Sequence, residues 1–280
     1  MSQALNKIKT RIKSVSGAYK VTSAMKLVST IKLKSWKNKM LGNKEYQNSL
    51  SDVVDQILLC SEKVKSPFIK INENNKKKLF IVVSSTLGLC GSYNQNIFKV
   101  GDTVISDADT AIILGSKGVA HYHDAKFEIL PGFENYNGSQ DSASIKLISN
   151  FVINEFEKGN FGEVHILYSE YKNSLTFIPK DYKLLPVISS KEETLDYPPI
   201  MEPSQKELIN ELIPLYVRGQ IHAKLLESSV CEEASRSNAM ENATNNAKDI
   251  LDELKIEFNK TRQGAITQEI IEIVSASKSV

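Results

Sequence analysis

Cysteine and histidine are the side chains of this 280-residue chain with the most obvious chemistry, and they are few: three Cys and four His. Cys90 lies in the glycine-flanked segment GLCG (88–91), directly after the apolar run LFIVVSS. A cysteine beside such a turn could act as a nucleophile if His121, His123 or His165 served as its base. Nothing in the sequence fixes a base or an oxyanion hole near it, and a small buried cysteine is the commoner case. We therefore expect Cys90 to be structural.

Two further motifs could bind ligands. Glycine-rich turns between a strand and a helix can point backbone N–H groups at phosphate, but GLCG is not GxGxxG, and the chain has no GxxxxGK[ST]. The histidines of HYHD (121–124) have a spacing that a metal could use on a strand, yet no third ligand is indicated. The sequence therefore predicts a tight turn at GLCG, a solvated element end at HYHD, and no cofactor or metal.

Positive charge is concentrated at the N-terminus. Residues 1–44 hold eleven Lys or Arg and no Asp or Glu, in a chain whose net charge is only +2. A basic helix can bind nucleic acid or an anionic membrane, but few aromatic residues accompany the charges and the apolar face is weak. Residues 201–280 carry thirteen acidic and nine basic residues, so the opposite end of the chain is a natural partner.

The two ends are predicted to be unusually long helices. All eight prolines lie between Pro67 and Pro214. Apolar or small side chains recur every three or four residues in both flanks, which is typical of one buried helix face; they are Ile8, Ile12, Val15, Tyr19, Thr22 and Met25, and Met240, Ala243, Ala247, Ile250, Leu254 and Phe258. At 1.5 Å per residue the helices would be roughly 80 and 100 Å long. We expect an antiparallel coiled coil with a narrow, only loosely heptad seam.

The middle of the chain has a different pattern. Three short runs rich in Ile and Val, at 79–85, 110–116 and 164–170, predict strands buried on both faces. They alternate with expected helices at 93–107, 116–122 and 139–157, which indicates a mostly parallel, Rossmann-like open α/β sheet. Residues 174–187 could add an edge strand stopped by Pro179 and Pro186.

These patterns predict three parts: an N-terminal coiled-coil helix at 1–60, an α/β domain at 68–200 and a C-terminal coiled-coil helix at 205–280. No stretch has the ~18 consecutive apolar residues that span a bilayer, and no secretory signal pattern is present. Cys60, Cys90 and Cys231 are far apart and without CxxC spacing, which favours a reducing compartment.

The C-terminal stretch 259–280 is unusual for a helix end. Polar residues from Arg262 to Glu269 precede four β-branched apolar residues within five positions, Ile270, Ile271, Ile273 and Val274. A frayed tail rarely has this composition. The pattern predicts a helix tip enclosed by another surface.

Three stretches together resemble the gamma subunit of F-type ATP synthases: RIKSVSGAYKVTSAMKLVST (11–30), SSTLGLCGSYNQNIF (84–98) with LGSKG (114–118), and residues 234–274. The resemblance covers both ends and the middle in the right order. It implies a coiled coil with an inserted α/β domain, acting as a non-catalytic central-stalk rotor. The implied partners are the alpha and beta subunits of the head, the epsilon subunit and the membrane c-subunit ring. It implies proton-driven ATP synthesis, a peripheral position at the cytoplasmic side of a bacterial cell membrane, no bound cofactor, no nucleic acid and no direct bilayer insertion.

The resemblance also assigns residues to roles. Rotor–stator coupling positions are Lys20, Thr22, Met25, Arg236, Arg262, Gln263, Thr267 and Glu269; an apolar bearing is formed by Ile270, Ile273 and Val274; the foot holds Tyr216, Arg218 and His222. Ser23, Ser237 and Asn238 depart from the residues common in the family. The competing functions are a coiled-coil scaffold or nucleic-acid-binding protein that uses the basic helix, and an α/β enzyme with Cys90 as nucleophile.

Overall fold

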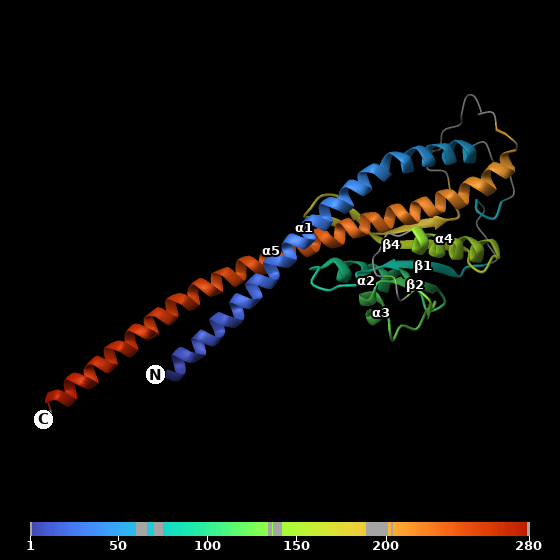
Figure 1. The fold of residues 1–280 in the computed structure, drawn as a ribbon. Coiled ribbons are helices and arrows are strands. Elements are labelled where there is room, and N and C mark those ends of the chain that lie inside the picture. Colours follow the sequence, from blue (N-terminus) through green and yellow to red (C-terminus); the bar gives the residue numbers. More distant parts are fainter. Residues whose placement is uncertain are drawn as a thin grey trace. The chain divides into compact units, whose positions relative to one another are not determined.

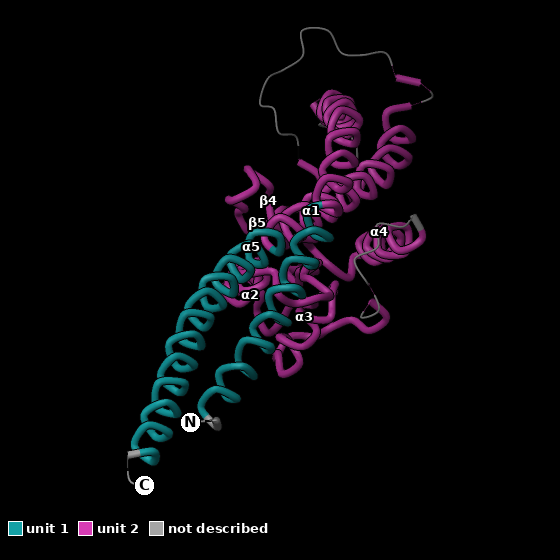
Figure 2. Tube along the Cα trace, turned by 60° about the vertical axis from the view of Figure 1, so that its left-hand side comes forward, with its two compact units in different colours: residues 1–30, 236–280 teal, residues 31–235 magenta. Residues whose placement is uncertain are grey.

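The computed structural model describes residues 2–59, 66–69, 75–133, 136, 142–188, 201–202 and 204–278. The chain forms two compact units, one from residues 1–30 and 236–280 and the other from residues 31–235 (Figure 2). Helices α1 (Ser2–Leu59) and α5 (Gln205–Lys278) each contribute to both units. Cys60 and residues 189–200 lie outside the described residues.

The first unit, which we call the helix-pair unit, joins the start of α1 to the end of α5. Three side-chain contacts connect the helices: Thr30 Oγ1 with Ser237 Oγ at 3.1 Å, Lys26 Nζ with Glu241 Oε1 at 2.7 Å, and Thr22 Oγ1 with Thr244 Oγ1 at 2.9 Å. Residue numbers fall on α1 as they rise on α5, so the helices are antiparallel. The predicted pairing of the two chain ends is confirmed for this unit.

The seam of the helix-pair unit broadly follows a heptad spacing. Shielded positions in steps of four and three are Leu5, Ile8, Ile12, Val15, Tyr19, Thr22, Lys26 and Ser29 on α1, and Met240, Thr244, Ala247, Leu251, Leu254, Phe258, Thr261 and Ala265 on α5. Ser16, Ser23, Met25 and Ala243 are also partly shielded outside this series, so the seam is only loosely heptad and contains small and polar residues, as predicted. Ile250 is exposed and Leu251 takes its seam place, because a step of four after Ala247 keeps the stripe on one face.

The second unit, which we call the sheet unit, contains a five-stranded sheet of order β3-β2-β1-β4-β5 (Figure 1). Its strands are β1 (Lys78–Val83), β2 (Thr110–Leu114), β3 (Glu128–Ile129), β4 (Glu163–Tyr171) and β5 (Phe177–Leu185). All neighbouring pairs are parallel except β4 and β5. The three predicted buried strands are confirmed, and the sequence reasoning missed the two-residue β3.

The edge strand β5 differs in one respect from the strand predicted at residues 174–187. Pro179 does not stop β5 but lies inside it, opposite Ser169. An edge strand tolerates proline because one side of its backbone has no partner strand. The strand ends at Leu185, immediately before Pro186.

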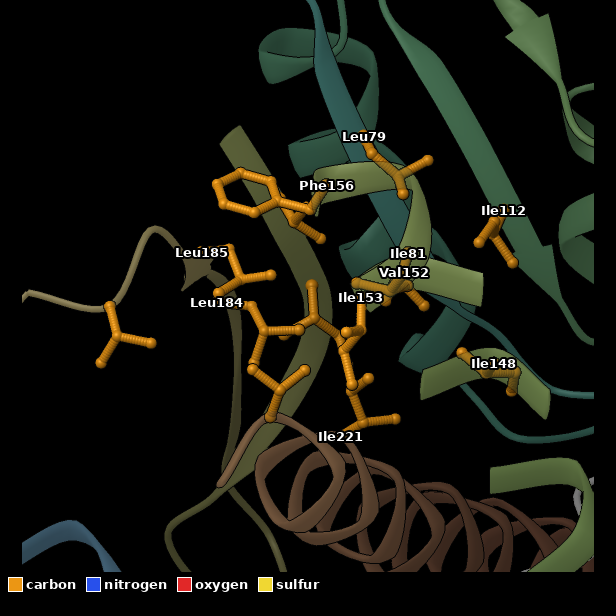
Figure 3. Packing of buried hydrophobic residues seen from close by; sticks show 14 of the residues in the cluster. Leu79, Ile81, Ile112, Ile148, Val152, Ile153, Phe156, Leu184, Leu185 and Ile221 are labelled. Carbon is orange, nitrogen blue, oxygen red and sulfur yellow. The ribbon is translucent and has the colours of Figure 1, made fainter. Parts of the chain in front are cut away.

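Side chains alternate between the two faces of the sheet. On one face Leu79, Ile81 and Val83 of β1 pack with residues of α4 (Ser142–Glu157) and α5, as Figure 3 shows for the part of this cluster around Ile148, Val152 and Ile221. On the other face Phe80 and Val82 pack with α2 (Tyr93–Val104) and the end of α3 (Ser116–His121). Burial on both faces explains why the strands are continuous apolar runs.

Candidate functional site

The predicted coupling residues of α1 do not share one environment. Lys20 is exposed, Met25 is half-buried, and Thr22 lies in the seam, where its hydroxyl donates to the Tyr19 carbonyl at 3.1 Å. Thr22 therefore faces α5 in the helix-pair unit. The predicted contact of Thr22 with another subunit stays a prediction. Any such contact would depend on the residues next to Thr22 on α1.

The outward face of the same helix segment is apolar. Val21, Leu27 and Val28 are each more than half exposed, Leu27 at 63%. Their neighbours Lys20 and Ala24 belong to a shallow depression along this face. The sequence analysis did not name Leu27. Leu27 follows Lys26 and lies off the heptad stripe, so its side chain cannot reach the seam and faces outward.

Arg236 has an unexpected environment for a residue assigned to contact with a neighbouring subunit. It is only 4% exposed, and a buried guanidinium is normally paired or hydrogen-bonded. The adjacent Ser237 hydroxyl meets Thr30 across the helix pair. Arg236 is therefore shielded within this chain, and a role in coupling stays a prediction.

Among the described residues, none of α1 lies opposite the C-terminal end of α5. The register set by Thr22 and Thr244 places Ser2 opposite Gly264, and Ala265 is the last buried residue. From there to Ser277 every residue is exposed. The predicted coupling residues Arg262, Gln263, Thr267 and Glu269 lie in or next to this segment, and Thr267 Oγ1 donates to the Gln263 carbonyl at 3.0 Å.

This exposed tip has a broad apolar side. Ile270, Ile271, Ile273 and Val274 are each about half exposed or more, Ile273 at 69%. Gln268, Glu269 and Glu272 occupy the rest of the helix circumference. Enclosure of the tip by another surface stays a prediction.

The predicted foot residues lie on the part of α5 that belongs to the sheet unit. Tyr216 Oη is 3.4 Å from Tyr182 Oη of β5, and Arg218 Nη2 donates to Asn150 Oδ1 of α4 at 3.0 Å. Burial, with a smaller effect from Lys39, lowers the pKa of His222. Arg218 and His222 also line a cavity of about 250 Å³. At least Tyr216 and Arg218 thus make contacts within this chain.

The residues that suggested enzymatic chemistry are not assembled into a catalytic site. Cys90 is buried, with its Sγ 3.6 Å from Ser85 Oγ and 3.4 Å from Asn94 Nδ2. In the part of the chain that is described, no histidine is hydrogen-bonded to this thiol. The GLCG segment is the expected tight turn, in which Leu89 and Gly91 have positive φ angles of 61° and 56°.

The HYHD histidines lie at an element end, as expected. His121 closes α3 and stacks on Phe98 at a centroid distance of 4.2 Å, whereas His123 follows the helix and is largely exposed. Among the described residues, no group of three His, Cys, Asp or Glu side chains could hold a metal ion. A search of the same residues finds no helix long and apolar enough to cross a membrane.

The two terminal helices form an antiparallel pair, an α/β unit is inserted between them in the sequence, and the tip of α5 exposes apolar side chains. These features define a stalk-type protein rather than a self-contained globular domain. Comparison with known proteins identifies the family. The ATP synthase family model matches residues 4–280. The chain is 35% identical to the ATP synthase gamma chain of Mycoplasma mycoides, over 98% of each chain, and 33% identical to that of Clostridium acetobutylicum, over 98% of this chain and 97% of the other. The chain belongs to the family of ATP synthase gamma chains.

Solved structures show the same fold at lower sequence identity. A chain of the Euglena gracilis mitochondrial ATP synthase, solved as OSCP/F1/c-ring, matches with a TM-score of 0.71 and 15% identity, over 100% of this chain and 95% of that one. A chain from the central stalk and c-ring structure of the Tetrahymena thermophila mitochondrial enzyme matches with a TM-score of 0.57 and 22% identity, over 80% and 99%. Family membership does not favour the nucleic-acid-binding alternative for the basic helix.

Proposed function

We propose that this chain is the non-catalytic rotor subunit in the central stalk of a proton-translocating F-type ATP synthase. In this role it couples proton flow through the membrane c-subunit ring to ATP synthesis or hydrolysis in the head of alpha and beta subunits. The epsilon subunit is a further partner at the foot, and the chain lies peripherally on the cytoplasmic side of a bacterial cell membrane. The observation that carries this proposal is the uncovered apolar tip of α5 in a chain of the gamma family.

The tip supports the rotor role because leaving its apolar side chains exposed to water is unfavourable in free energy. Each uncovered Ile or Val side chain in water loses roughly 1.5–3 kcal/mol relative to burial. Ile270, Ile273 and Val274 are therefore proposed as the apolar bearing, with Arg262, Gln263, Thr267 and Glu269 as the adjoining coupling positions. A ring of surrounding subunits would cover all sides of the tip at once.

A rotor also needs a surface that contacts the stator without being fixed to it. Along α1, Lys20 and Met25 are proposed as direct coupling positions, and the exposed Leu27 is proposed as a third. Thr22 and Arg236 are proposed to act by holding the helices in register. Such contacts bias the conformations of the surrounding catalytic subunits only if they differ between those conformations.

The functional division of the chain is proposed to follow the sequence pattern. Residues 1–60 and 205–280 provide the shaft, and residues 68–200 provide the α/β domain. Tyr216, Arg218 and His222 are proposed to belong to the foot, with Tyr216 and Arg218 bracing α5 against β5 and α4.

The first test is purification of the chain from its native cell, followed by identification of the bound proteins. Recovery with ATP synthase alpha and beta subunits is expected. Recovery alone or with nucleic acid would overturn the proposal.

The sharper test separates assembly from coupling. Met25→Lys and Leu27→Lys are expected to leave the complex assembled but to reduce ATP-driven proton pumping at a given rate of ATP hydrolysis. Leu147→Lys, on the exposed side of α4, is the matched control and should pump normally. Normal pumping by both α1 variants would contradict the role given to this face.

A further inference from the structure

A cavity of the sheet unit has an excess of positive charge. It measures about 410 Å³ and lies between residues 37–51 of α1, residues 220–227 of α5 and the end of β4. Among the described residues that line it, four are lysines and one is acidic, namely Lys37, Lys44, Lys172 and Lys224, and Glu227. A volume of this size is typical of sites for small molecules. The charge of the wall favours an anion.

The cavity exists because α1 presents a polar face here. Lys37, Lys44, Asn48 and Ser51 lie three, four or seven residues apart, so they share one side of the helix. In the helix-pair unit, by contrast, apolar side chains contribute to the contact between α1 and α5. Long charged side chains keep their ends in contact with water or a counter-ion, so they leave space between the two helices.

Lys224 is the most shielded of these lysines whose contacts the structure gives. Its side chain is 17% exposed, and its Nζ lies 4.7 Å and 4.6 Å from the ring centroids of Tyr168 and Tyr182. Within the described chain Lys224 donates no hydrogen bond, and its one ion pair joins Nζ to Glu227 Oε2 at 4.0 Å. Burial lowers the pKa of Lys224, against a smaller opposing effect of Glu227 and Glu170. A shielded ammonium group is stabilised by an anion that hydrogen-bonds to it.

The acidic residues near the cavity already have other partners. Glu227 Oε1 accepts a hydrogen bond from the backbone N–H of Tyr171 at 2.9 Å. Glu170 Oε2 lies 3.1 Å from Nζ of Lys172 and 3.8 Å from Nζ of Lys180. Lys172 is therefore largely neutralised within the chain, and the excess charge of the cavity comes from the lysines of α1 and from Lys224.

The remaining polar groups of the wall are donors without acceptors. Lys37 contacts the ring of Tyr171, with Nζ 5.6 Å from its centroid, and neither Lys37 nor Lys44 forms an ion pair with a described residue. Gln47 is only 7% exposed, and its side-chain amide makes no hydrogen bond within the described chain. Its Oε1 is fully shielded, so its Nε2 is the polar atom that can face the cavity. Ammonium and amide donors without acceptors are suited to an oxyanion.

We propose that this cavity binds a small organic phosphate ester, whose phosphate oxygens accept hydrogen bonds from Lys224, Lys44 and Gln47. A phosphate monoester carries about two negative charges at neutral pH, and lysine is a common ligand of phosphate. Leu41 and Tyr171 in the wall can contact the organic part of the ester. The site is independent of the rotor role, because it lies within the sheet unit of a single chain.

The direct test is isothermal titration calorimetry of the full-length chain with ribose 5-phosphate. Saturable binding is expected, and ribose, which lacks the phosphate, should not bind. Binding should weaken between about 50 mM and 500 mM salt, because ions screen the attraction. Equal binding of the two compounds, or a Kd for ribose 5-phosphate weaker than about 1 mM, would overturn the proposal.

Phosphate also occurs in the head groups of phospholipids, so a second arm separates the two sources. The chain is floated with vesicles of phosphatidylglycerol, and with vesicles of phosphatidylcholine as the control without net charge. A free ester is expected, since the cavity lies between two helices and the end of a strand. Binding to phosphatidylglycerol vesicles without binding of ribose 5-phosphate would overturn the assignment to a free ester.

Variants locate the site. Lys224→Gln should weaken the binding of ribose 5-phosphate about tenfold, the effect of losing one hydrogen bond to a charged group. Lys44→Gln should weaken it about threefold, because Lys44 is exposed and its attraction is screened. The matched control is Lys99→Gln, an exposed lysine of α2 outside the cavity, which should bind as the native chain does.

Circular dichroism of each variant establishes that it is folded. Native affinity in folded Lys224→Gln and Lys44→Gln would overturn the site. If Lys224→Gln fails to fold, Lys44→Gln decides alone, since an exposed side chain without an ion pair can be changed with little effect on stability.

Discussion

The helix-pair unit and the sheet unit bury their apolar residues in different ways. In the sheet unit, strands such as β1 are covered on both faces, so Leu79, Phe80, Ile81 and Val82 are all essentially inaccessible to water. In the helix-pair unit only one narrow stripe of each helix is covered, and Leu27 and Ile273 remain outside. Both units expose some apolar side chains, but the sheet unit buries a core between several elements, whereas the helix-pair unit buries only a stripe between two helices.

The largest expected effect therefore belongs to the sheet unit. Ile166→Ala on the interior strand β4 removes a fully buried side chain and should reduce the free energy of unfolding by about 4 kcal/mol. Trp36, the only tryptophan, belongs to this unit, so its fluorescence during urea unfolding reports the change. The control Ile178→Ala, at a partly exposed position of β5, should cost much less. Equal costs would contradict the difference in burial.

The corresponding change in the helix-pair unit should be smaller. Leu254→Ala deletes a seam residue that the register places opposite Ile12, and the cost should be about 2 kcal/mol, the low end for leucine, because a narrow seam can close around the gap. Helix content followed by circular dichroism at 222 nm during heating measures it. Ile256→Ala, outside the seam, should change stability by less than about 0.5 kcal/mol. If Leu254→Ala lowered the free energy of unfolding as much as Ile166→Ala does, the two units would not differ in how strongly their buried residues stabilise them.

Much of this fold could be predicted because apolar residues follow a regular pattern in the sequences of both units. The Ile- and Val-rich runs predict β1, β2 and β4, and the absence of proline before Pro67 and after Pro214 predicts α1 and most of α5, which also continues through Pro214. The error at Ile250 arose because steps of three and four are both allowed on a helix, and only the partner helix decides between them. Pro179 was misjudged because the sequence does not show which edge of a strand is unpaired.

The candidate surfaces were harder to predict, because residue type alone does not show which way a side chain faces. Thr22 and Arg236 were grouped with exposed Lys20, although Thr22 lies in the seam and Arg236 is buried. Leu27 was missed because it lies off the apolar stripe that recurs every three or four residues. The segment Ile270–Val274 stood out because it has four β-branched residues in five positions; it is helical and exposed, and its enclosure by another surface stays a prediction.

A third change tests whether the charges of the sheet unit add to its core. Glu163→Gln keeps the size of the side chain but removes its charge from Lys183, Lys78 and His165, and it should cost about 1–2 kcal/mol at neutral pH. The folded-state pKa of Glu163 is lowered to about 2 from 4.5. Its stabilisation is therefore complete above the unfolded-state pKa and is lost as the pH falls from about 4.5 towards 2.

The measurement for Glu163→Gln is urea unfolding followed by Trp36 fluorescence at a series of pH values. The difference between the native chain and the variant should shrink as the pH is lowered through this window. A difference that stays constant down to about pH 2 would show that the lost stability comes from packing rather than from the charge.

The smallest expected effect tests the corresponding charge contact of the helix-pair unit. Lys26 Nζ lies 2.7 Å from Glu241 Oε1, but both side chains are more than a third exposed, so water and salt screen their attraction. Lys26→Ala should cost less than about 1 kcal/mol, and the difference should vanish in about 1 M salt. The matched control is Lys255→Ala, which removes a contact of 2.9 Å with Asp252 within α5 alone and leaves the pairing of the helices intact. If the Lys26 variant loses clearly more stability than the control and keeps that loss in high salt, then the aliphatic stem of Lys26, which is part of the seam, contributes more than its charge does.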